Sequence, residues 1–365
     1  MKIVKCILFA LLFMVIGSFM GLALSISAAK KMNSDANWYS ASTGIDRAYF
    51  VELAGIQQHL RVRGRDRNNP VLLDLHGGPG SSFMGMNHRN YKALTEYFTV
   101  IEWDQPGAGL SAFEDPDRIN YDFMVDTAIE LIHLIQQEYK SGKVVLVGHS
   151  WGSMLGLGII HKRPDLISAY VGVGQALAWN SGFDETQRLL LETAKQNNDR
   201  QTIESLSQLP TQWPVPENID ATLERIGTIQ APLTKYKGGL YASKTNNLYK
   251  SNMVLDIATS PDISVANGLA MLSLSDASRA LMKDLYNKDL RAELGYVFKV
   301  PIFIFQGEHD WQTPTTLVKP WFEKISAPHK SYIPFTNSAH MVFTEEPGKY
   351  LIEMVTKVRP VSLAN

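Results

Sequence analysis

The run Val144–Ser153, which reads VVLVGHSWGS, constrains the chain more than any other stretch. Its four leading apolar residues predict a buried strand, and the small and apolar residues 154–160 predict a helix directly afterwards. A Gly-X-Ser-X-Gly motif centred on Ser150 joins the two, and a sharp turn there needs glycine at positions 148 and 152. Such a strained turn holds the Ser150 hydroxyl out in a cleft, above a helix N-terminus that favours negative charge. The motif therefore predicts a nucleophilic serine, and a serine that only caps the next helix is the alternative.

The composition of the chain sets only wide limits on its domains and partners. A chain of 365 residues is long enough for one large domain or two modest ones, and 45% hydrophobic content is enough to bury a sizeable core. The formal net charge of -1 gives no electrostatic reason to expect a nucleic acid or a strongly charged partner. Cys6 is the only cysteine, so neither a disulfide framework nor a thiolate metal site is predicted, and no cofactor is expected.

The first 29 residues form a segment of their own. Residues 3–26 are almost entirely apolar apart from Lys5, and they are about long enough to cross a bilayer as a helix. This run is longer than the core of a usual signal peptide, which favours an uncleaved membrane anchor. Ser27-Ala28-Ala29 is a suitable cleavage site, so a secreted protein remains the alternative. Either way, the rest of the chain lies outside the cytoplasm if the amino terminus stays inside.

Strand and helix signals then alternate along the chain. Residues 30–47 are predicted to be a linker, and residues 48–62 a β-hairpin at the edge of a sheet. Apolar runs predict buried strands at 71–75, 98–103, 144–147, 168–174, 300–305 and 330–333. Helical spacing between Tyr121 and Tyr139 predicts a crossover helix. This alternation predicts an α/β fold with a mostly parallel sheet that is covered on both faces.

The pattern changes between residues 177 and 294. No clear buried strand occurs there, and amphipathic runs such as 185–195 alternate with proline turns and aromatic residues. We therefore expect a mainly helical cap over the carboxyl edge of the sheet. The predicted core then consists of residues 48–176 and 295–365.

An acid and a base follow the last two strands in the order that this architecture requires. Asp310 lies in the loop after strand 302–305, with Glu308 as the second choice, and His340 lies in the loop after the strand near 332. An imidazole can accept the serine proton at neutral pH, and a carboxylate can hold the required tautomer of that imidazole. We therefore predict Ser150, Asp310 and His340 as a catalytic triad.

An oxyanion hole is expected from two backbone N–H groups. One belongs to Trp151, directly after the serine, and the other to Gly78, with Gly77 as the alternative. A phosphate-binding loop competes for the run His76–Gly80, but Pro79 has no N–H and no Gly-Lys-Ser/Thr follows. The run Asp104–Ser111 is predicted to order a loop beside the site.

These motifs together carry a resemblance. They are His76-Gly77-Gly78-Pro79-Gly80, Asp104–Ser111, Gly148–Ser153, the loop Gly307–Asp310 and His340. In order and spacing, residues 45–360 resemble the α/β-hydrolase superfamily and, within it, the proline iminopeptidase group. The resemblance implies an eight-stranded, mostly parallel sheet with helices on both faces and a helical cap. It also implies a serine hydrolase that releases an N-terminal residue, often proline, from short peptides, with acidic cap side chains holding the free amine.

Some residues depart from that group. His149 stands where its members usually have glycine, and Pro106 where arginine is common; Gly-His-Ser-Trp-Gly is also widespread among hydrolases that act on esters. The candidate amine-binding acids of the cap are Glu185, Glu192, Glu204, Glu217 and Glu224, and none is assigned. The expected partners are a small peptide or acyl substrate and a membrane. An esterase or amidase is the alternative function, and a non-catalytic binding protein the second alternative. Epoxide hydrolase and dehalogenase chemistry is disfavoured, because those relatives have an aspartate where this chain has Ser150.

Overall fold

The computed structural model describes residues 2–36, 39–40, 42–111, 113, 115–210, 219–241, 246–270 and 273–364. Its centre is an eight-stranded sheet with the strand order β1-β2-β4-β3-β5-β6-β7-β8. The strands are β1 (Ile45–Leu53), β2 (Ile56–Gly64), β3 (Val71–Leu75), β4 (Thr99–Trp103), β5 (Val144–His149), β6 (Ile167–Val173), β7 (Ile302–Gly307) and β8 (Lys330–Phe335). The β1–β2 and β2–β4 pairs are antiparallel and all the others are parallel. The predicted fold, a mostly parallel sheet with a hairpin at one edge, is confirmed.

Helices cover both faces of this sheet, and so the central strands β3 to β7 are buried along their whole length and mostly apolar. The core helices are α2 (Met84–Asn90), α3 (Tyr121–Tyr139), α4 (Trp151–Lys162), α12 (Thr315–Lys324), α13 (Val342–Glu345), α14 (Pro347–Glu353) and α15 (Arg359–Leu363), with short turns η1 (Leu94–Glu96), η2 (Pro116–Arg118), η3 (Pro164–Leu166) and the π-helical η4 (Met354–Val358). Buried side chains of α3, α4 and α12 pack on one face of the sheet. Those of η1, α13, α14 and η4 pack on the other.

The crossover helix α3 shows how local sequence sets the element bounds. The Asn120 side chain accepts a hydrogen bond from the Phe123 N–H at 2.9 Å, which caps the first turn. Lys140 ends the helix in the left-handed region, with φ of 48°. Ile129, Ile132 and other apolar residues of the inner face are buried against the sheet. The helix therefore occupies the predicted residues 121–139.

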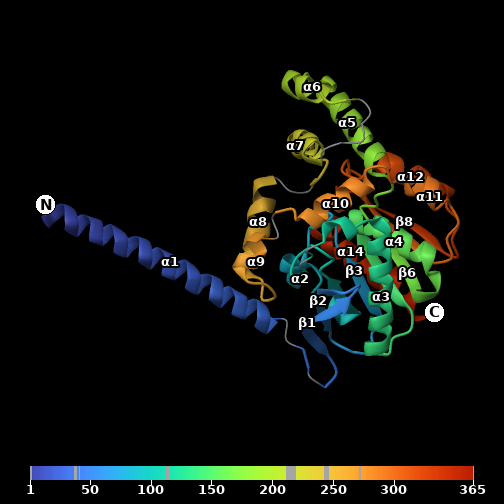
Figure 1. The fold of residues 1–365 in the computed structure, drawn as a ribbon, viewed down its shortest axis with the longest axis horizontal. Helices are drawn as coiled ribbons and strands as arrows, with labels where there is room; N and C mark the ends of the chain where they lie inside the picture. The colour runs from blue at the N-terminus through green and yellow to red at the C-terminus, as the bar shows by residue number, and fades with distance from the viewer. Residues whose placement is uncertain are drawn as a thin grey trace.

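A helical cap occupies the segment between β6 and β7, as predicted. Its helices are α5 (Trp179–Gln196), α6 (Arg200–Ser207), α7 (Ile219–Lys235), α8 (Asn246–Thr259), α9 (Val265–Ala270), α10 (Asp276–Leu285) and α11 (Leu290–Glu293). Apolar residues of α5, α6 and α7, such as Leu190, Leu206 and Ile229, form a small core of their own. Helix α10 joins the cap to the main core through Leu281 and Leu285. Figure 1 shows α5, α6 and α7 beyond one end of the sheet and α8 and α9 along its flank.

The amino-terminal segment is one helix, α1 (Lys2–Ala36), which projects from the body of the molecule (Figure 1). Its stretch Met14–Asp35 is long and apolar enough to cross a membrane, judged by length and composition alone. The predicted linker 30–47 is partly wrong, because the helix continues through residues 30–36 and β1 begins at Ile45. Ala28, Ala29 and Lys30 are good helix formers, and the last turns of the helix pack on α8.

Two carboxyl groups lie side by side inside the sheet. Asp74 of β3 is in register with Glu102 of β4, and both side chains are buried. Burial raises the pKa of Asp74 to about 7, although the hydroxyl of Tyr91 donates a hydrogen bond to Asp74 Oδ1 at 2.9 Å. Burial likewise raises the pKa of Glu102 to about 8, against the opposing effect of Arg63. Ionisation of either carboxyl group therefore lowers the stability of the folded protein.

Asp74→Asn should make stability less dependent on pH. The pKa of Asp74 is higher in the folded than in the unfolded chain, so its stabilising contribution is complete below about pH 4 and is lost as the pH rises through about 7. Between pH 5 and pH 8, the free energy of unfolding of the native protein should fall by roughly 3 kcal/mol more than that of the variant. Urea unfolding at both pH values measures this difference. Asp117→Asn on the exposed turn η2 is the control, and equal pH dependence of all three proteins would contradict the assignment.

Candidate active site

Ser150 stands at a strained turn between β5 and α4. Its backbone has φ of 54° and ψ of -121°, in the left-handed region that non-glycine residues rarely adopt. The Ser150 N–H donates to the carbonyl of Val173 at the end of β6, which fixes the turn to the sheet. Trp151 is the first helical residue, so its N–H has no acceptor within α4.

Two glycines make this turn possible. A Cβ atom on Gly148 would lie 2.3 Å from the carbonyl oxygen of Gly152. A Cβ atom on Gly152 would lie 2.0 Å from the carbonyl oxygen of Leu75 on the neighbouring strand β3. Both contacts are with backbone, which cannot rotate away. The turn is therefore pressed directly against β3, as the motif predicts.

The loops after β7 and β8 bring the predicted acid and base together. His340 Nδ1 lies 2.9 Å from Asp310 Oδ2, and both side chains are buried. His340 Nε2, on the opposite side of the ring, is buried and has no hydrogen-bond partner among the described residues. The second choice for the acid, Glu308, is exposed on the same loop. Asp310, and not Glu308, is therefore the carboxylate that contacts this imidazole.

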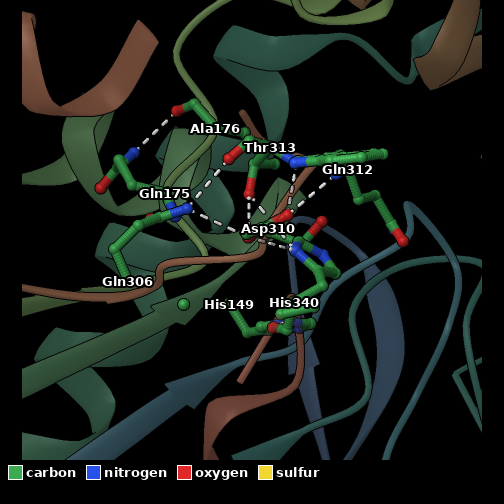
Figure 2. Close-up of polar contacts among 12 residues, drawn as sticks. His149, Gln175, Ala176, Gln306, Asp310, Gln312, Thr313 and His340 are labelled. Carbon is green, nitrogen blue, oxygen red and sulfur yellow. Dashed lines mark hydrogen bonds and ion pairs between the residues drawn. The ribbon is translucent and has the colours of Figure 1, made fainter. Parts of the chain in front are cut away.

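Asp310 accepts hydrogen bonds from several groups besides His340. The backbone N–H groups of Gln312 and Thr313 donate to Oδ1 at 2.9 Å and 2.8 Å. The Thr313 hydroxyl and the Gln306 amide donate to Oδ2 at 2.7 Å and 3.0 Å. These donors replace water around a fully buried carboxylate and fix the direction in which it faces His340 (Figure 2).

A row of buried side chains ties this acid to the serine turn, and the sequence patterns did not identify it. The Ser153 hydroxyl donates to the carbonyl of Ser150 at 2.5 Å, and the Gln175 amide donates to that hydroxyl at 3.1 Å. The Gln175 backbone N–H then donates to Gln306 Oε1 at 3.0 Å, and Gln306 reaches Asp310 (Figure 2). Gln175 and Gln306 lie at the carboxyl ends of parallel strands, where site residues of such sheets gather. Their position at the strand ends was the sequence feature that could have identified these two glutamines.

The glycine-rich loop after β3 is held beside Ser150. Gln105 links the two, because its side chain donates to the carbonyl of His76 at 3.1 Å and accepts from Trp151 Nε1 at 2.9 Å. Asp104 accepts hydrogen bonds from the Ser82 hydroxyl and the Leu110 N–H, which orders both ends of the surrounding loops. The run Asp104–Ser111 therefore has the structural role that its sequence predicts.

The predicted oxyanion residues border the same cleft. Gly78, with φ of 116°, lines a cavity together with Ser150 and Trp151. A Cβ atom on Gly77 would lie 3.2 Å from Ser150 Cβ. Glycine therefore lets both backbone segments approach the serine closely.

His149, the departure from the glycine that is usual in the resembling group, packs against the base. The centroids of the His149 and His340 rings lie 4.6 Å apart, and His149 Nε2 donates to the carbonyl oxygen of His340 at 3.1 Å. Burial, together with the neighbouring His340, holds the pKa of His149 well below its usual range. His149 is therefore a neutral side chain that supports the loop of His340.

The cavity at Ser150 extends beneath the cap and is mainly apolar. Its apolar lining comes from both the cap and the core: Met154, Leu177, Trp179, Phe183, Ile226, Ile229, Leu233, Met282, Leu317 and Val318. Its polar side chains besides Ser150 and Trp151 are uncharged: Gln175, Thr186, Gln230, Gln312 and Thr313. Among the residues that the structure describes, no Asp, Glu, Lys or Arg lines this cavity.

The candidate amine-binding acids are accordingly elsewhere. Glu185 and Glu192 both pair with Arg188 on α5, and Glu185 also accepts a hydrogen bond from Thr316. Glu204 and Glu224 are exposed on α6 and α7. Glu217 lies outside the described residues. The structure therefore brings none of the four described glutamates into the cavity.

Comparison with known proteins places these features in a wider group. The family model described as "alpha/beta hydrolase fold" matches residues 70–347. A "Probable aminopeptidase YbaC" of Bacillus subtilis (strain 168) is 29% identical over 306 residues, which are 82% of this chain and 92% of that protein. A "Proline iminopeptidase" of Heyndrickxia coagulans is 22% identical over 309 residues, 83% of this chain and 95% of that protein.

A solved structure extends the likeness to the whole fold. The crystal structure of a membrane phospholipase A superposes with a TM-score of 0.62 at 14% identity, and the alignment covers 99% of both chains. At this identity the likeness concerns the fold alone. Because the alignment covers nearly the whole of this chain, it includes α1.

Gly152→Ala should destabilise the fold, because its Cβ atom would meet the backbone of β3. We expect a loss of about 3 kcal/mol in the free energy of unfolding, as for other overpacked sites. The matched control is Gly142→Ala, since a Cβ atom there has no neighbour within 4 Å. Thermal unfolding of the three proteins measures this loss. Equal stability of the two variants would show that the turn can accommodate a Cβ atom at position 152.

Proposed function

The chain belongs to the α/β-hydrolase fold family, and from this we propose that it is a serine hydrolase in which Ser150 is the nucleophile, His340 the general base and Asp310 the acid that orients the base. The observation that carries the proposal is the contact between His340 and Asp310, in the loops after β8 and β7, at the carboxyl edge of the sheet where Ser150 follows β5. Asp310 holds His340 Nδ1 at 2.9 Å, and the unpaired Nε2 of His340 is available to a hydroxyl in the cleft.

The proposed reaction proceeds through an acyl-enzyme. The Ser150 oxygen attacks the carbonyl carbon of the substrate while its proton passes to His340 Nε2. Asp310 stabilises the resulting imidazolium, and the N–H groups of Trp151 and Gly78 donate to the oxyanion. The imidazolium then protonates the leaving amine or alcohol. A water molecule, activated by the same histidine, releases the acid and restores Ser150.

The substrate we propose is a short peptide or peptide amide whose N-terminal residue is apolar, with proline as the best candidate. The names of the two relatives support an aminopeptidase. The apolar cavity at Ser150 supports an acyl group without charge on its side chain. A second candidate, a carboxylesterase or amidase, is favoured by one observation: the described lining contains no carboxylate to pair with a substrate ammonium.

We further propose that α1 anchors the enzyme in a membrane with the catalytic domain outside the cytoplasm. The apolar run 3–26 supports this location, and so does the 35-residue length of the helix. A secreted form that has lost residues 1–29 is the alternative.

Ser150→Ala should abolish hydrolysis and leave the fold intact, because alanine fits wherever serine does. A fluorophosphonate probe should label the native protein at Ser150 only.

Asp310→Asn should lower kcat by about 10²–10⁴, because the wrong imidazole tautomer is then favoured. Glu308→Gln is the matched control and should change kcat little, since Glu308 is exposed. The reverse order of the two carboxylate variants would show that Glu308 is the acid, and labelling at another residue would refute the role of Ser150.

The two candidate functions are separated by a comparison of substrates. An aminopeptidase should cleave Pro-β-naphthylamide well and its N-acetylated counterpart poorly, because a buried ammonium needs a carboxylate partner. Neutralising the amine-binding acid, with Glu217→Gln as the first variant to test, should weaken that preference. Glu204→Gln, which changes an exposed glutamate on α6, is the control. Rapid cleavage of p-nitrophenyl butyrate without activity on Pro-β-naphthylamide would instead identify an esterase.

A further inference from the structure

We propose that the last two turns of α1 are part of the catalytic domain: they dock on the cap segment Thr259–Ile263 and hold it against α2, so the helix is retained in the mature protein. The docking itself is independent of the reaction. Its expected effect on turnover rests on the proposed function.

The docking face of α1 is a regular stripe. Ile26, Ala29, Lys30 and Asn33 are half-buried, whereas the residues between them are exposed. These positions are spaced i, i+3, i+4 and i+7, so they lie on one side of the helix. The described residues from 14 to 25 are exposed on every side, as expected for a segment that lipid surrounds. The stripe begins where the apolar run ends.

Two hydrogen bonds join this stripe to the cap. Asn33 Nδ2 donates to the carbonyl oxygen of Thr259 at 2.9 Å, and Lys30 Nζ donates to that of Ile263 at 2.5 Å. Thr259 is the last residue of α8, where carbonyl groups do not accept hydrogen bonds from within the helix. Asn33 and Lys30 thus satisfy carbonyl groups that the cap alone leaves open.

The same cap segment is fixed to the core on its other side. Asp262 is buried and accepts hydrogen bonds at 2.9 Å from Arg61 and Arg63 of β2. Ile263 packs in an apolar cluster with Met86 of α2 and Ile257 of α8. The segment therefore lies between α1 and α2.

Helix α2 connects this arrangement to the active site. It begins at Met84, two residues after Ser82, whose hydroxyl donates to Asp104. A Cβ atom on Gly85 would lie 2.7 Å from Ile263 Cδ1, so α2 and the cap segment are in close contact. The loop that carries Gly78 is thus braced from one side by a segment that α1 holds in place.

This packing also distinguishes an anchor from a signal peptide. Cleavage after Ala29 would remove Ile26 and Ala29 and leave Lys30–Ala36 as a remnant of fewer than eight residues. An isolated helix of that length is not stable in water, so its hydrogen bonds to the cap would be lost. With α1 intact, Lys30 lies only about 6 Å beyond Ile26, at 1.5 Å per residue. The cap segment is therefore held close to the membrane surface.

Hydrogen exchange of the full-length protein in lipid nanodiscs tests the docking. Lys30→Met and Asn33→Ala each remove one donor and leave a residue that suits a helix. In the double variant, the amides of Ser260, Asp262 and Ile263 should exchange at least about fivefold faster than in the native protein. Lys31→Met is the matched control, because Lys31 is exposed and pairs with Asp35 on α1 itself; this variant should exchange like the native protein. Equal exchange rates in all these proteins would overturn the docking.

The mass of the protein purified from native membranes tests retention. A chain that still contains residues 1–29 supports the proposal, and a mature chain that begins at Lys30 overturns it. Turnover by the double variant should fall severalfold while labelling of Ser150 by the fluorophosphonate persists. If the native protein is not labelled at all, the proposed function fails, and the exchange rates still decide whether α1 docks.

Discussion

The site depends on one close contact, the backbone of the serine turn pressed against β3. With only 2.0 Å between a Cβ atom on Gly152 and the carbonyl oxygen of Leu75, no other residue type fits there without a backbone shift. This contact forces Ser150 into a backbone conformation that is unfavourable for serine by itself. The neighbouring strands supply the compensation, since Ser150 N–H binds Val173 and the Trp151 side chain binds Gln105. Hydrogen bonds from neighbouring parts of the core thus hold the strained backbone of Ser150 in place.

Around this turn, amide side chains do the work of positioning. The side chains of Gln105 and Gln306 each bridge two segments that come from different strands. Gln175 binds Ser153 of α4 through its side chain and Gln306 through its backbone N–H. A glutamine can donate and accept at once and carries no charge, so it satisfies buried groups on both sides without a further desolvation cost. The loops of the serine, the acid and the oxyanion donors are therefore linked to one another as well as to the strands they follow. This explains how residues from four parts of the chain keep a common geometry.

The sequence predicted those parts whose signal is local. A buried strand, a glycine turn and an apolar helix are written in adjacent residues, and so β5, α4 and α3 have nearly the predicted bounds. The fixed order of serine, acid and histidine likewise predicted that Asp310 and His340 would meet.

Contacts between distant segments were not predictable in this way. The bridge from Gln175 to Gln306 spans 131 residues, and that from Lys30 to Ile263 spans 233. Polar residues such as Lys30 and Asn33 also look like a linker in sequence, because nothing local indicates the carbonyl groups that they bind. In the folded protein, packing on the cap adds to the helix propensity of Ala28, Ala29 and Lys30 in these turns of α1.

The cavity and the anchor together limit the substrate more than either does alone. The described lining is apolar and uncharged, which suits an apolar acyl group, whether it is a prolyl residue or a fatty acyl chain. A peptide substrate needs a carboxylate for its ammonium, and none of the four described candidate glutamates of the cap lines the cavity. A lipid substrate needs no such group but must leave the bilayer, and the proposed anchoring by α1 would shorten that path. The presence of a free amine therefore separates peptide from lipid substrates. A site that gives an ammonium no carboxylate partner cannot bind it tightly.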